Sequence, residues 1–353
     1  MAGITVVPFG RTENGEETAL YKIVNESGAG MTVCSYGGSI VALEVPDREG
    51  NLKDVVLGYD HLQEYERGKA FFGALIGRCG NRIAGGRMEI DGQSYQLAVN
   101  SGSNHLHGGV KGFDKKVWDV HVERNNALHL HLTSPDLDEQ YPGKMEVDVR
   151  YTFDDENRLV ITYHAVSDRD TLCNLTNHVY FNLAGHDSGT VEDQIIQIHG
   201  NSFLPVDENL IPTGEIRSVT GTPFDFRMPK PIGRDIGSED EQIKRGEGYD
   251  HNYVLNHQRS EKIWDAAAAY SKETGISLIC KTTQPGMQFY TGNHVLPQQG
   301  KRGASYRSRQ GFCMETQAFP DAVHHENFPS VLLKAGEVYE HKTVYEFGTE
   351  EPF

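Results

Sequence analysis

Hydrophobic and polar residues alternate along much of the chain with the two-residue period of β-strands. The clearest alternation places apolar side chains on one parity over residues 145–153 and again over residues 159–165. The four residues between these runs, Asp154 to Asn157, are typical of a turn, so the pair is predicted to form a β-hairpin. Similar runs occupy residues 117–122, 128–132, 276–281 and 339–347, and 38 glycines favour turns between them. The predicted fold class is therefore mostly β.

Residues 261–270 are ambiguous, because their run of four alanines favours a helix by intrinsic propensity. However, the turn-like residues Glu273 to Gly275 separate this segment from the predicted strand at 276–281. Sheet context overrides weak propensities, so we predict that 261–270 is a strand and forms the other arm of a hairpin.

Residues 174–183 are expected to form a strand with two chemically different faces. One face carries the apolar residues Leu175, Val179, Phe181 and Leu183. The other carries a row of hydrogen-bonding groups from Asn174, Thr176, His178, Tyr180 and Asn182. Amides, hydroxyls and an imidazole without a charge cluster suit a neutral polyhydroxylated ligand such as a sugar, and His178 adds a group that titrates near neutrality.

Composition narrows the partners and the cellular location. The chain has 353 residues, enough for a large core, and residues 1–353 are expected to form one domain. Its 50 acidic and 33 basic residues give a net charge of -17, which argues against nucleic-acid and membrane partners. With neither a long apolar run nor a signal-like N-terminus, a cytoplasmic protein is expected. The five scattered cysteines are expected to be free thiols.

Two residues are the first candidates for catalysis. Glu315 is a lone carboxylate in the apolar run 311–316, where burial would shift its pKa. The alternative is a glutamate on an edge strand that faces water. His178 is either a catalytic group or a hydrogen-bonded core imidazole.

Four further segments carry polar side chains that suit a binding site. His105 and His107 lie two residues apart on a predicted strand, but no third ligand has a metal-like spacing, so no metal site is expected. Asn81 and Arg82 follow a glycine-rich stretch and could hold sugar hydroxyls, or lie in a solvated loop. Residues 249–252 and 284–290 place polar groups beside aromatic ones, which is also common in structural turns.

Taken together, these segments resemble the galactose mutarotase (aldose 1-epimerase) family over about Gly10 to Phe347. The motifs occur in the family's order at residues 81–84, 106–109 with 112–115, 174–183, 249–252, 284–292 and 314–317. The resemblance implies an isomerase with a large antiparallel β-sandwich and a concave sugar-binding face. It makes Glu315 the general base and His178 the general acid. It also implies that the sugar is contacted by Asn81, Arg82, His107, Tyr180, Asp250 and Gln288. One departure is the pair Cys79 and Gly80, where a valine- or alanine-like pair is expected.

The implied reaction interconverts the α and β anomers of free hexoses such as galactose and glucose. It opens the ring when a base takes the C1 hydroxyl proton and an acid protonates the ring oxygen, and it needs no cofactor. Attraction between a Glu315 carboxylate and a His178 imidazolium is expected to outweigh their desolvation.

Three alternatives stay open. A glycosidase or lyase would use two carboxylates, and a hexose-phosphate mutarotase would need a cluster of basic residues, of which the motifs contain only Arg82. A sugar-binding module without catalysis would not need both Glu315 and His178. The only partner expected is a small hexose, and the protein is expected to be a monomer or a homodimer.

Overall fold

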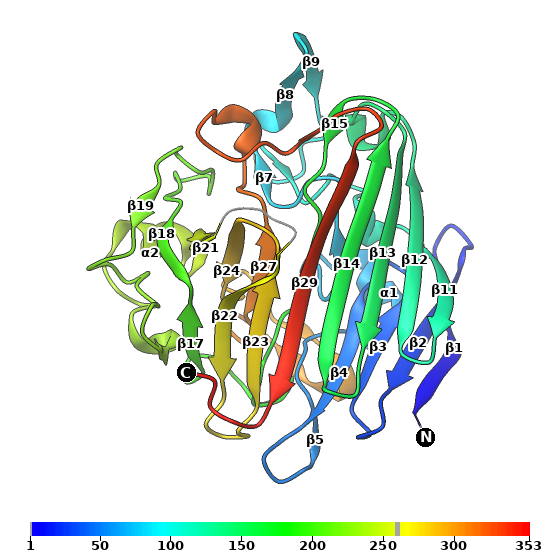
Figure 1. Cartoon of the computed structure of the whole chain (residues 1–353), viewed down its shortest axis with the longest axis vertical. Coiled ribbons are helices and arrows are strands. Elements are labelled where there is room, and N and C mark those ends of the chain that lie inside the picture. Colours follow the sequence, from blue (N-terminus) through cyan, green and yellow to red (C-terminus); the bar gives the residue numbers. More distant parts are fainter. Residues whose placement is uncertain (1, 258–261) are drawn as a thin grey trace.

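The computed structural model describes residues 2–257 and 262–353, and antiparallel β-strands form most of it (Figure 1). The largest sheet has nine strands in the order β11-β12-β13-β14-β29-β23-β22-β17-β20. In that order their bounds are Asp119–Arg124, Ala127–Ser134, Met145–Phe153, Arg158–Ser167, Val338–Gly348, Ser277–Thr282, Trp264–Tyr270, Ile195–Ile198 and Lys230–Pro231. The prediction of a mostly β, antiparallel fold is confirmed.

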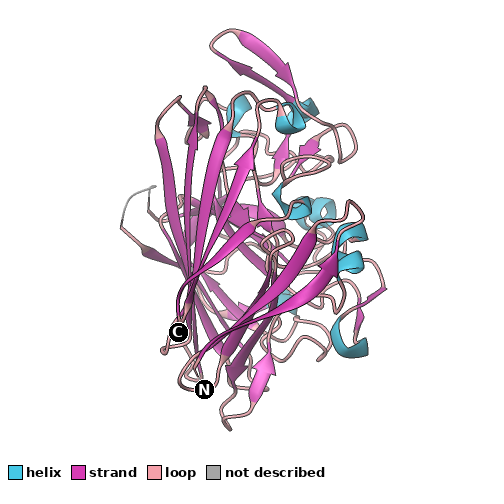
Figure 2. Ribbon diagram, turned by 90° about the vertical axis from the view of Figure 1, so that its right-hand side faces the viewer, coloured by secondary structure: helices cyan, strands magenta, loops and turns pink. Residues whose placement is uncertain are grey.

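Two five-stranded sheets accompany the nine-stranded sheet. The N-terminal sheet consists of β1 (Gly3–Arg11), β2 (Glu17–Val24), β3 (Gly30–Cys34), β4 (Ile40–Pro46) and β5 (Leu52–Asp54). The other has the order β19-β18-β21-β24-β27, with bounds Arg217–Ser218, Gly200–Phe203, Asp250–Leu255, Gly286–Tyr290 and Cys313–Gln317. Figure 2 shows the nine-stranded sheet as one layer, and the other strands and the short helices lie on one side of it.

The remaining elements are short. The paired two-stranded ladders are β6 (Leu75–Ile76) with β16 (Thr176–Asn177), β7 (Arg82–Ile83) with β10 (His105–Leu106), β8 (Arg87–Ile90) with β9 (Gln93–Gln96), β15 (Thr171–Leu172) with β28 (Leu332–Leu333), and β25 (Gln298–Gln299) with β26 (Ser305–Tyr306). The α-helices are α1 (Leu62–Arg67) and α2 (Glu241–Gly246). Single 3-10 turns lie at Ala84–Gly86, Phe113–Lys115, Asp138–Gln140, Ile232–Arg234, Lys301–Gly303 and Ala322–His324. None of the helices in the described ranges is long and apolar enough to cross a membrane.

The predicted hairpins are present. β13 and β14 pair from Met145 with Ser167 to Phe153 with Leu159, as their alternation indicates. The ambiguous segment is a strand from Trp264 to Tyr270, since β22 pairs with β23 in a hairpin. Residue 261 of that prediction lies outside the described residues. Cross-strand packing in the sheet thus outweighs the helix propensity of the four alanines.

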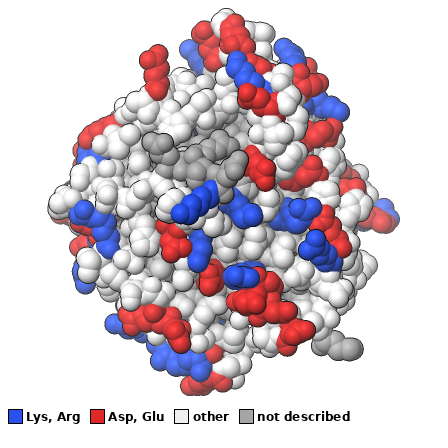
Figure 3. All heavy atoms as spheres, in the orientation of Figure 1, with Lys and Arg blue, Asp and Glu red and all other residues white. Residues whose placement is uncertain are grey.

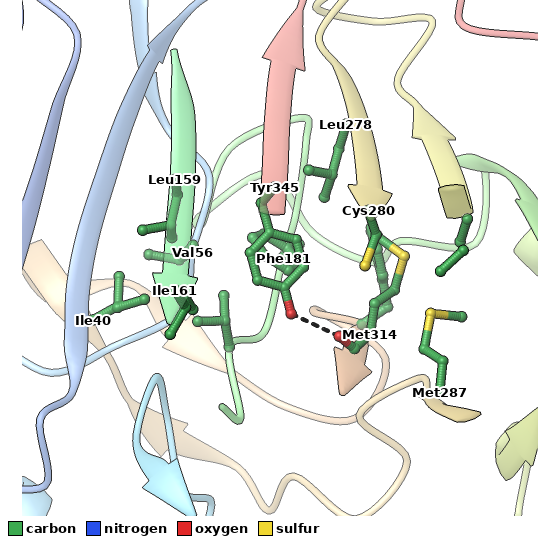
Figure 4. Close-up of a cluster of buried hydrophobic side chains, with 14 of the residues drawn as sticks. Ile40, Val56, Leu159, Ile161, Phe181, Leu278, Cys280, Met287, Met314 and Tyr345 are labelled. Carbon is green, nitrogen blue, oxygen red and sulfur yellow. Dashed lines mark hydrogen bonds between the residues drawn. The ribbon is translucent and has the colours of Figure 1, made fainter. Parts of the chain in front are cut away.

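A hydrophobic core fills the space between the layers (Figure 4). Leu159 and Ile161 of β14 and Leu278 of β23 point into it from the nine-stranded sheet. Met287 of β24 and Met314 of β27 reach it from the other side. The hydroxyl of Tyr345, on β29, crosses the layer and donates a hydrogen bond to the Met314 carbonyl oxygen at 2.7 Å. The core therefore fixes the position of β27 relative to the large sheet.

The segment 174–183 is not the continuous strand that its alternation predicts. Only Thr176 and Asn177 form a ladder, and Phe181 makes single bridges to Val56 and Phe312. The backbone instead bonds to several neighbours in turn; for example, Phe181 N–H donates to the Phe312 carbonyl and Asn182 N–H to the Val55 carbonyl. The chain threads between several segments here, so it stays extended without pairing with one partner strand.

Charged side chains of both signs are mixed on the outward face of the nine-stranded sheet (Figure 3). Ion pairs on this face include Arg150 with Glu123, at 2.6 Å, and Lys281 with Glu346, at 3.1 Å. The excess of acidic residues is thus not gathered into a single-sign patch on the face that Figure 3 shows.

Candidate active site

Glu315 lies in the middle of β27, with its side chain on the face turned away from the core. Its neighbour Met314 packs into the core, and the Thr316 hydroxyl lies 2.6 Å from the Thr343 hydroxyl of β29. Because side chains alternate along a strand, Glu315 points to the other face. Along the sheet it stands opposite Gln288 of β24. Strand packing thus places a carboxylate beneath the loops that cover this sheet.

A cavity of about 300 Å³ opens above Glu315. Seven of the eight residues predicted for the site line it, namely Glu315, His178, Asn81, Arg82, His107, Tyr180 and Asp250. The eighth, Gln288, is buried beneath the cavity and does not line it. A larger, more open groove of about 810 Å³ runs along β1, β2 and β11, but none of the predicted residues lines it. The convergence of polar and titratable groups favours the smaller cavity as the functional site.

Glu315 and His178 form a buried pair at the base of this cavity. Nε2 of His178 lies 3.7 Å from Oε1 of Glu315, and their side chains are only 5% and 2% exposed. Oε2 of Glu315 has no hydrogen-bond partner among the described residues. The prediction of a buried acid is confirmed, and the alternative of an edge-strand glutamate facing water is wrong. A buried oxygen without a partner is ready to accept a hydrogen bond from a bound hydroxyl.

Burial controls the proton affinity of both groups. Desolvation lowers the pKa of His178 to about 4. Desolvation, with a smaller contribution from the negative charge of Asp250, raises the pKa of Glu315 well above its ordinary value, although Arg82 opposes this rise. The expectation that mutual attraction outweighs desolvation is therefore wrong for this pair. Between the two pKa values the pair holds a single proton.

Asn81 and His107 are locked together at one wall of the cavity. The His107 N–H donates to the Asn81 carbonyl oxygen at 3.0 Å, and the Asn81 N–H donates to Nδ1 of His107 at 3.1 Å. Burial lowers the pKa of His107, so its ring is neutral. Because Nδ1 accepts a hydrogen bond, the neutral ring carries its proton on Nε2. His107 is therefore a hydrogen-bond donor.

The same histidine decides whether the cavity suits a metal ion. Potential ligand atoms of His107, His178 and Glu315 all lie within 4.8 Å of one another. The fold thus brings three potential ligands together from distant segments, which the spacing in the sequence does not reveal. His105 is not among them, because its ring bonds to the Ala98 carbonyl oxygen and the Tyr141 hydroxyl. However, neither nitrogen of His107 offers a free lone pair, because one accepts from Asn81 and the other carries the proton. The donor set fits a metal ion poorly.

Arg82 and Asp250 form a charged wall. Nη1 of Arg82 lies 3.8 Å from Oδ2 of Asp250, and Gln288 donates to Oδ1 of Asp250 at 2.7 Å. Gln288 therefore acts on the cavity through Asp250. This explains why a residue in a recognised motif lies outside the cavity lining.

The polar row predicted on 174–183 divides between two tasks. His178 and Tyr180 reach the cavity, where their rings stack with centroids 4.9 Å apart. Asn174 instead bonds to the backbone of Ala318, and Asn182 bonds to the Gly189 and Gln310 carbonyl oxygens. The prediction of one continuous ligand-binding row is therefore wrong for these asparagines, because irregular buried backbone nearby needs their hydrogen bonds.

The chain resembles known proteins in both sequence and fold. The family model described as aldose 1-epimerase matches residues 19–346. The chain belongs to this family. It is 44% identical over 348 residues to galactose mutarotase of Bos taurus, an alignment that covers 98% of this chain and 99% of that protein. It is 35% identical to aldose 1-epimerase of Escherichia coli, with 96% and 97% covered. A solved aldose epimerase homologue from C. elegans has a TM-score of 0.87 at 31% identity and covers 95% of this chain and 100% of its own.

Gly80, one of the two residues at which a departure from the family pattern is noted above, has a structural explanation. A Cβ atom on Gly80 would lie 3.1 Å from Cγ2 of Thr176 and 3.2 Å from the Asn174 carbonyl oxygen. The Gly80 N–H donates to that same oxygen at 2.7 Å. The glycine allows this close approach, which holds the loop that leads into Arg82.

Sequence reasoning missed several residues of the candidate site. Lys69, Phe71, Ser101 and His294 also line the cavity. They lie outside the recognised polar motifs, and no spacing or alternation marks them. Only the folded loops bring them to Glu315.

Proposed function

We propose that this chain is an aldose 1-epimerase, an isomerase that interconverts the α and β anomers of free hexoses such as galactose and glucose. The observation that carries the proposal is the buried pair of Glu315 and His178 at the base of a polar cavity. Family membership at high coverage supports the same reaction.

The two groups divide the proton transfers of ring opening. Glu315 takes the proton from the C1 hydroxyl, and His178 delivers a proton to the ring oxygen, so the C1–O5 bond breaks and an aldehyde forms. Rotation about the C1–C2 bond and reversal of both transfers close the ring as the other anomer. Each well-placed proton-transfer group contributes about 10²- to 10⁴-fold to the rate.

The pair contains the one proton that this mechanism needs. Burial favours neutral Glu315 and neutral His178 in the empty site. The ionised arrangement, a carboxylate beside an imidazolium, contains the same number of protons. Moving one proton between the two side chains, whose nearest N and O atoms are 3.7 Å apart, therefore prepares the reaction without a proton from solvent.

The surrounding residues hold the sugar in register. The Nε2–H of His107 and the guanidinium of Arg82 donate to sugar oxygens and stabilise negative charge as it develops. Asp250, supported by Gln288, accepts from hydroxyls remote from C1, while Asn81 and Tyr180 shape the walls. The reaction uses no cofactor.

Polarimetry of freshly dissolved α-D-galactose and α-D-glucose tests this function. The optical rotation is expected to reach equilibrium faster with the protein than with a heat-inactivated sample. If the rotation changes at the buffer rate while titration calorimetry detects galactose binding, the protein is a sugar-binding module. Acceleration confined to a hexose 6-phosphate would instead indicate a phosphate-specific enzyme that uses Lys69 and Arg82.

We further infer that residues 1–353 act as one domain, because strands of all three large sheets contribute to one hydrophobic core. A cytoplasmic location is proposed from Cys34, Cys79, Cys280 and Cys313, which are free and buried thiols. We propose a free hexose as the substrate of a monomer or homodimer, with neither nucleic acid nor membrane as a partner.

A further inference from the structure

Phe71 lies over both histidines of the site, although no sequence motif marks it. Its ring stacks on His178, with centroids 5.7 Å apart and planes 27° apart, and meets His107 edge-on at 4.8 Å. Tyr180 stacks on His178 at 4.9 Å and 29°. Two neighbouring aromatic rings, those of Phe71 and Tyr180, therefore stack with the catalytic imidazole of His178.

The backbone fixes Phe71 relative to His178. The turn that begins at Phe71 places Gly73 and Ala74 beside the histidine, so that the Gly73 N–H donates to the His178 carbonyl oxygen at 3.0 Å. The His178 N–H in turn donates to the Ala74 carbonyl oxygen at 2.9 Å. The next residue, Phe72, is buried in a second apolar cluster. The loop that carries the Phe71 ring is thus attached to the residue that the ring covers.

Phe71 keeps this position at a conformational cost. Its φ of 57° lies in the left-handed region, which is rare for a bulky side chain. Such strained residues cluster at functional sites, where the surrounding structure holds them. The side chain is half-buried and lines the sugar cavity, so core packing alone does not explain its placement.

We propose that Phe71 is a positioning residue for the reaction, which holds the His178 ring against Tyr180 and keeps water from its face. The role rests on the proposed function, because it acts through the general acid. Glu315 lies 3.7 Å from Nε2, and the Cys313 sulfur lies 3.6 Å from Nδ1. His107 and Tyr290 meet the ring edge-on, at 5.1 and 6.2 Å between centroids. Loss of the aromatic cover would expose this neutral imidazole to water.

Three substitutions at one position test the proposal. Phe71→Leu removes the ring but keeps an apolar side chain, Phe71→Tyr keeps the ring, and Phe71→Gly removes the ring while accepting the positive φ. Phe9→Leu is the matched control, because Phe9 is also half-buried and contacts an aromatic ring, that of Tyr65 at 6.2 Å, outside the cavity. If the Phe71→Leu variant does not fold, the Phe71→Gly variant still tests the proposal.

His178 is titrated by imidazole NMR without sugar, and kcat and KM are measured at pH 7. In Phe71→Leu and Phe71→Gly, the pKa of His178 is expected to rise from about 4 toward the ordinary value of about 6.5. We expect kcat to fall about 10-fold with little change in KM. Phe71→Tyr and Phe9→Leu should resemble the wild type.

Two results would overturn the role of Phe71. One is an unchanged His178 titration in both ring-deleting variants, and the other is a rise in KM alone, which would make Phe71 a sugar contact. Because the titration needs no activity, a protein without mutarotase activity would refute the proposed function while the titration still decides whether Phe71 covers His178.

Discussion

Glu315 and His178 lose almost all contact with water in the folded chain, and this shifts their pKa values in opposite directions. The ordinary pKa values are near 4.3 for glutamate and near 6.5 for histidine. With these values the glutamate would ionise first, and the pair would hold one proton only in a narrow pH window below neutrality. With the order of the two pKa values reversed by burial, the pair holds one proton from about pH 4 up to the raised pKa of Glu315. This is the state from which one group can act as base and the other as acid.

The pH dependence of kcat/KM follows from this proton count. Below about pH 4 the pair gains a second proton and no base remains, so activity falls. Above the raised pKa of Glu315 the shared proton is lost and no acid remains. We expect a broad plateau that includes pH 7, with limbs that belong to the pair as a whole. Polarimetric rates from about pH 4 to 9, corrected for buffer catalysis, check this; an alkaline limb at the ordinary histidine value would contradict it.

His178→Asn separates proton transfer from binding. The amide keeps hydrogen-bonding capacity but cannot deliver a proton to the ring oxygen. We expect kcat to fall at least about 10²-fold while KM changes little, because the acid acts mainly in the transition state. Steady-state kinetics of the purified variant measure both constants. A large rise in KM at constant kcat would assign His178 to binding only.

Individual residues were predictable where their chemistry is unusual for their surroundings. An acid in an apolar run identified Glu315, and recognised motifs identified His178, Arg82 and Asp250. The direction of the pKa shifts was not predictable, because it depends on how completely the fold removes water. Phe71 was missed because a phenylalanine in a turn gives no chemical signal.

At the scale of elements, β27 connects the core to the site. Its odd-numbered residues face the cavity side, while Met314 and Thr316 contact the nine-stranded sheet. The hydrogen bond from the Tyr345 hydroxyl to the Met314 carbonyl oxygen ties β29 to this strand directly beside Glu315. A contact on the far side of the strand thus holds the backbone next to Glu315.

Tyr345→Phe is expected to lower the free energy of unfolding by about 1 to 2 kcal/mol, because a buried carbonyl oxygen loses its donor. Urea denaturation measures the change. Tyr95→Phe, on the half-exposed edge of the β8–β9 hairpin, serves as a control with an expected change below about 0.5 kcal/mol. Equal stability of the Tyr345 variant and the wild type would refute the structural role of this hydrogen bond.

Long hairpins were predictable as elements, whereas the extended segment at 174–183 was not. β13 and β14 repeat one pattern over many residues and pair with each other across a short turn, so local alternation suffices to predict this hairpin. Residues 174–183 show the same alternation, but their backbone hydrogen bonds go to several separate segments, at residues 55–57, 73–80 and 312. Nothing local in the sequence specifies such partners.

At the scale of the whole molecule, distant segments meet to build one site. Asn81, His107, His178, Asp250 and Glu315 come from five separate parts of the chain. The order of the family motifs made this assembly predictable, whereas the spacing of potential ligands did not reveal the close approach of His107, His178 and Glu315. Because these three side chains lie so close together, the cofactor-free mechanism needs a test with metal ions removed.

Activity is expected to survive removal of metal ions. The hydrogen bond from Asn81 leaves His107 without a free lone pair, and the proton transfers need only the two side chains. Prolonged EDTA treatment, followed by assay in metal-free buffer, should leave kcat unchanged within error. Loss of activity that a divalent ion restores would refute the mechanism.

The most direct test of the account is the rate of α-D-galactose mutarotation by Glu315→Gln. The amide preserves the size of the side chain and one hydrogen-bonding end, but it removes the base and the site of the shared proton. At pH 7, polarimetry should show a loss of at least about 10²-fold in kcat relative to the wild type. The thermal unfolding midpoint should not fall, because no hydrogen bond of Oε2 is lost. A folded variant that keeps more than about a tenth of the wild-type kcat would contradict the assignment of Glu315 as the base.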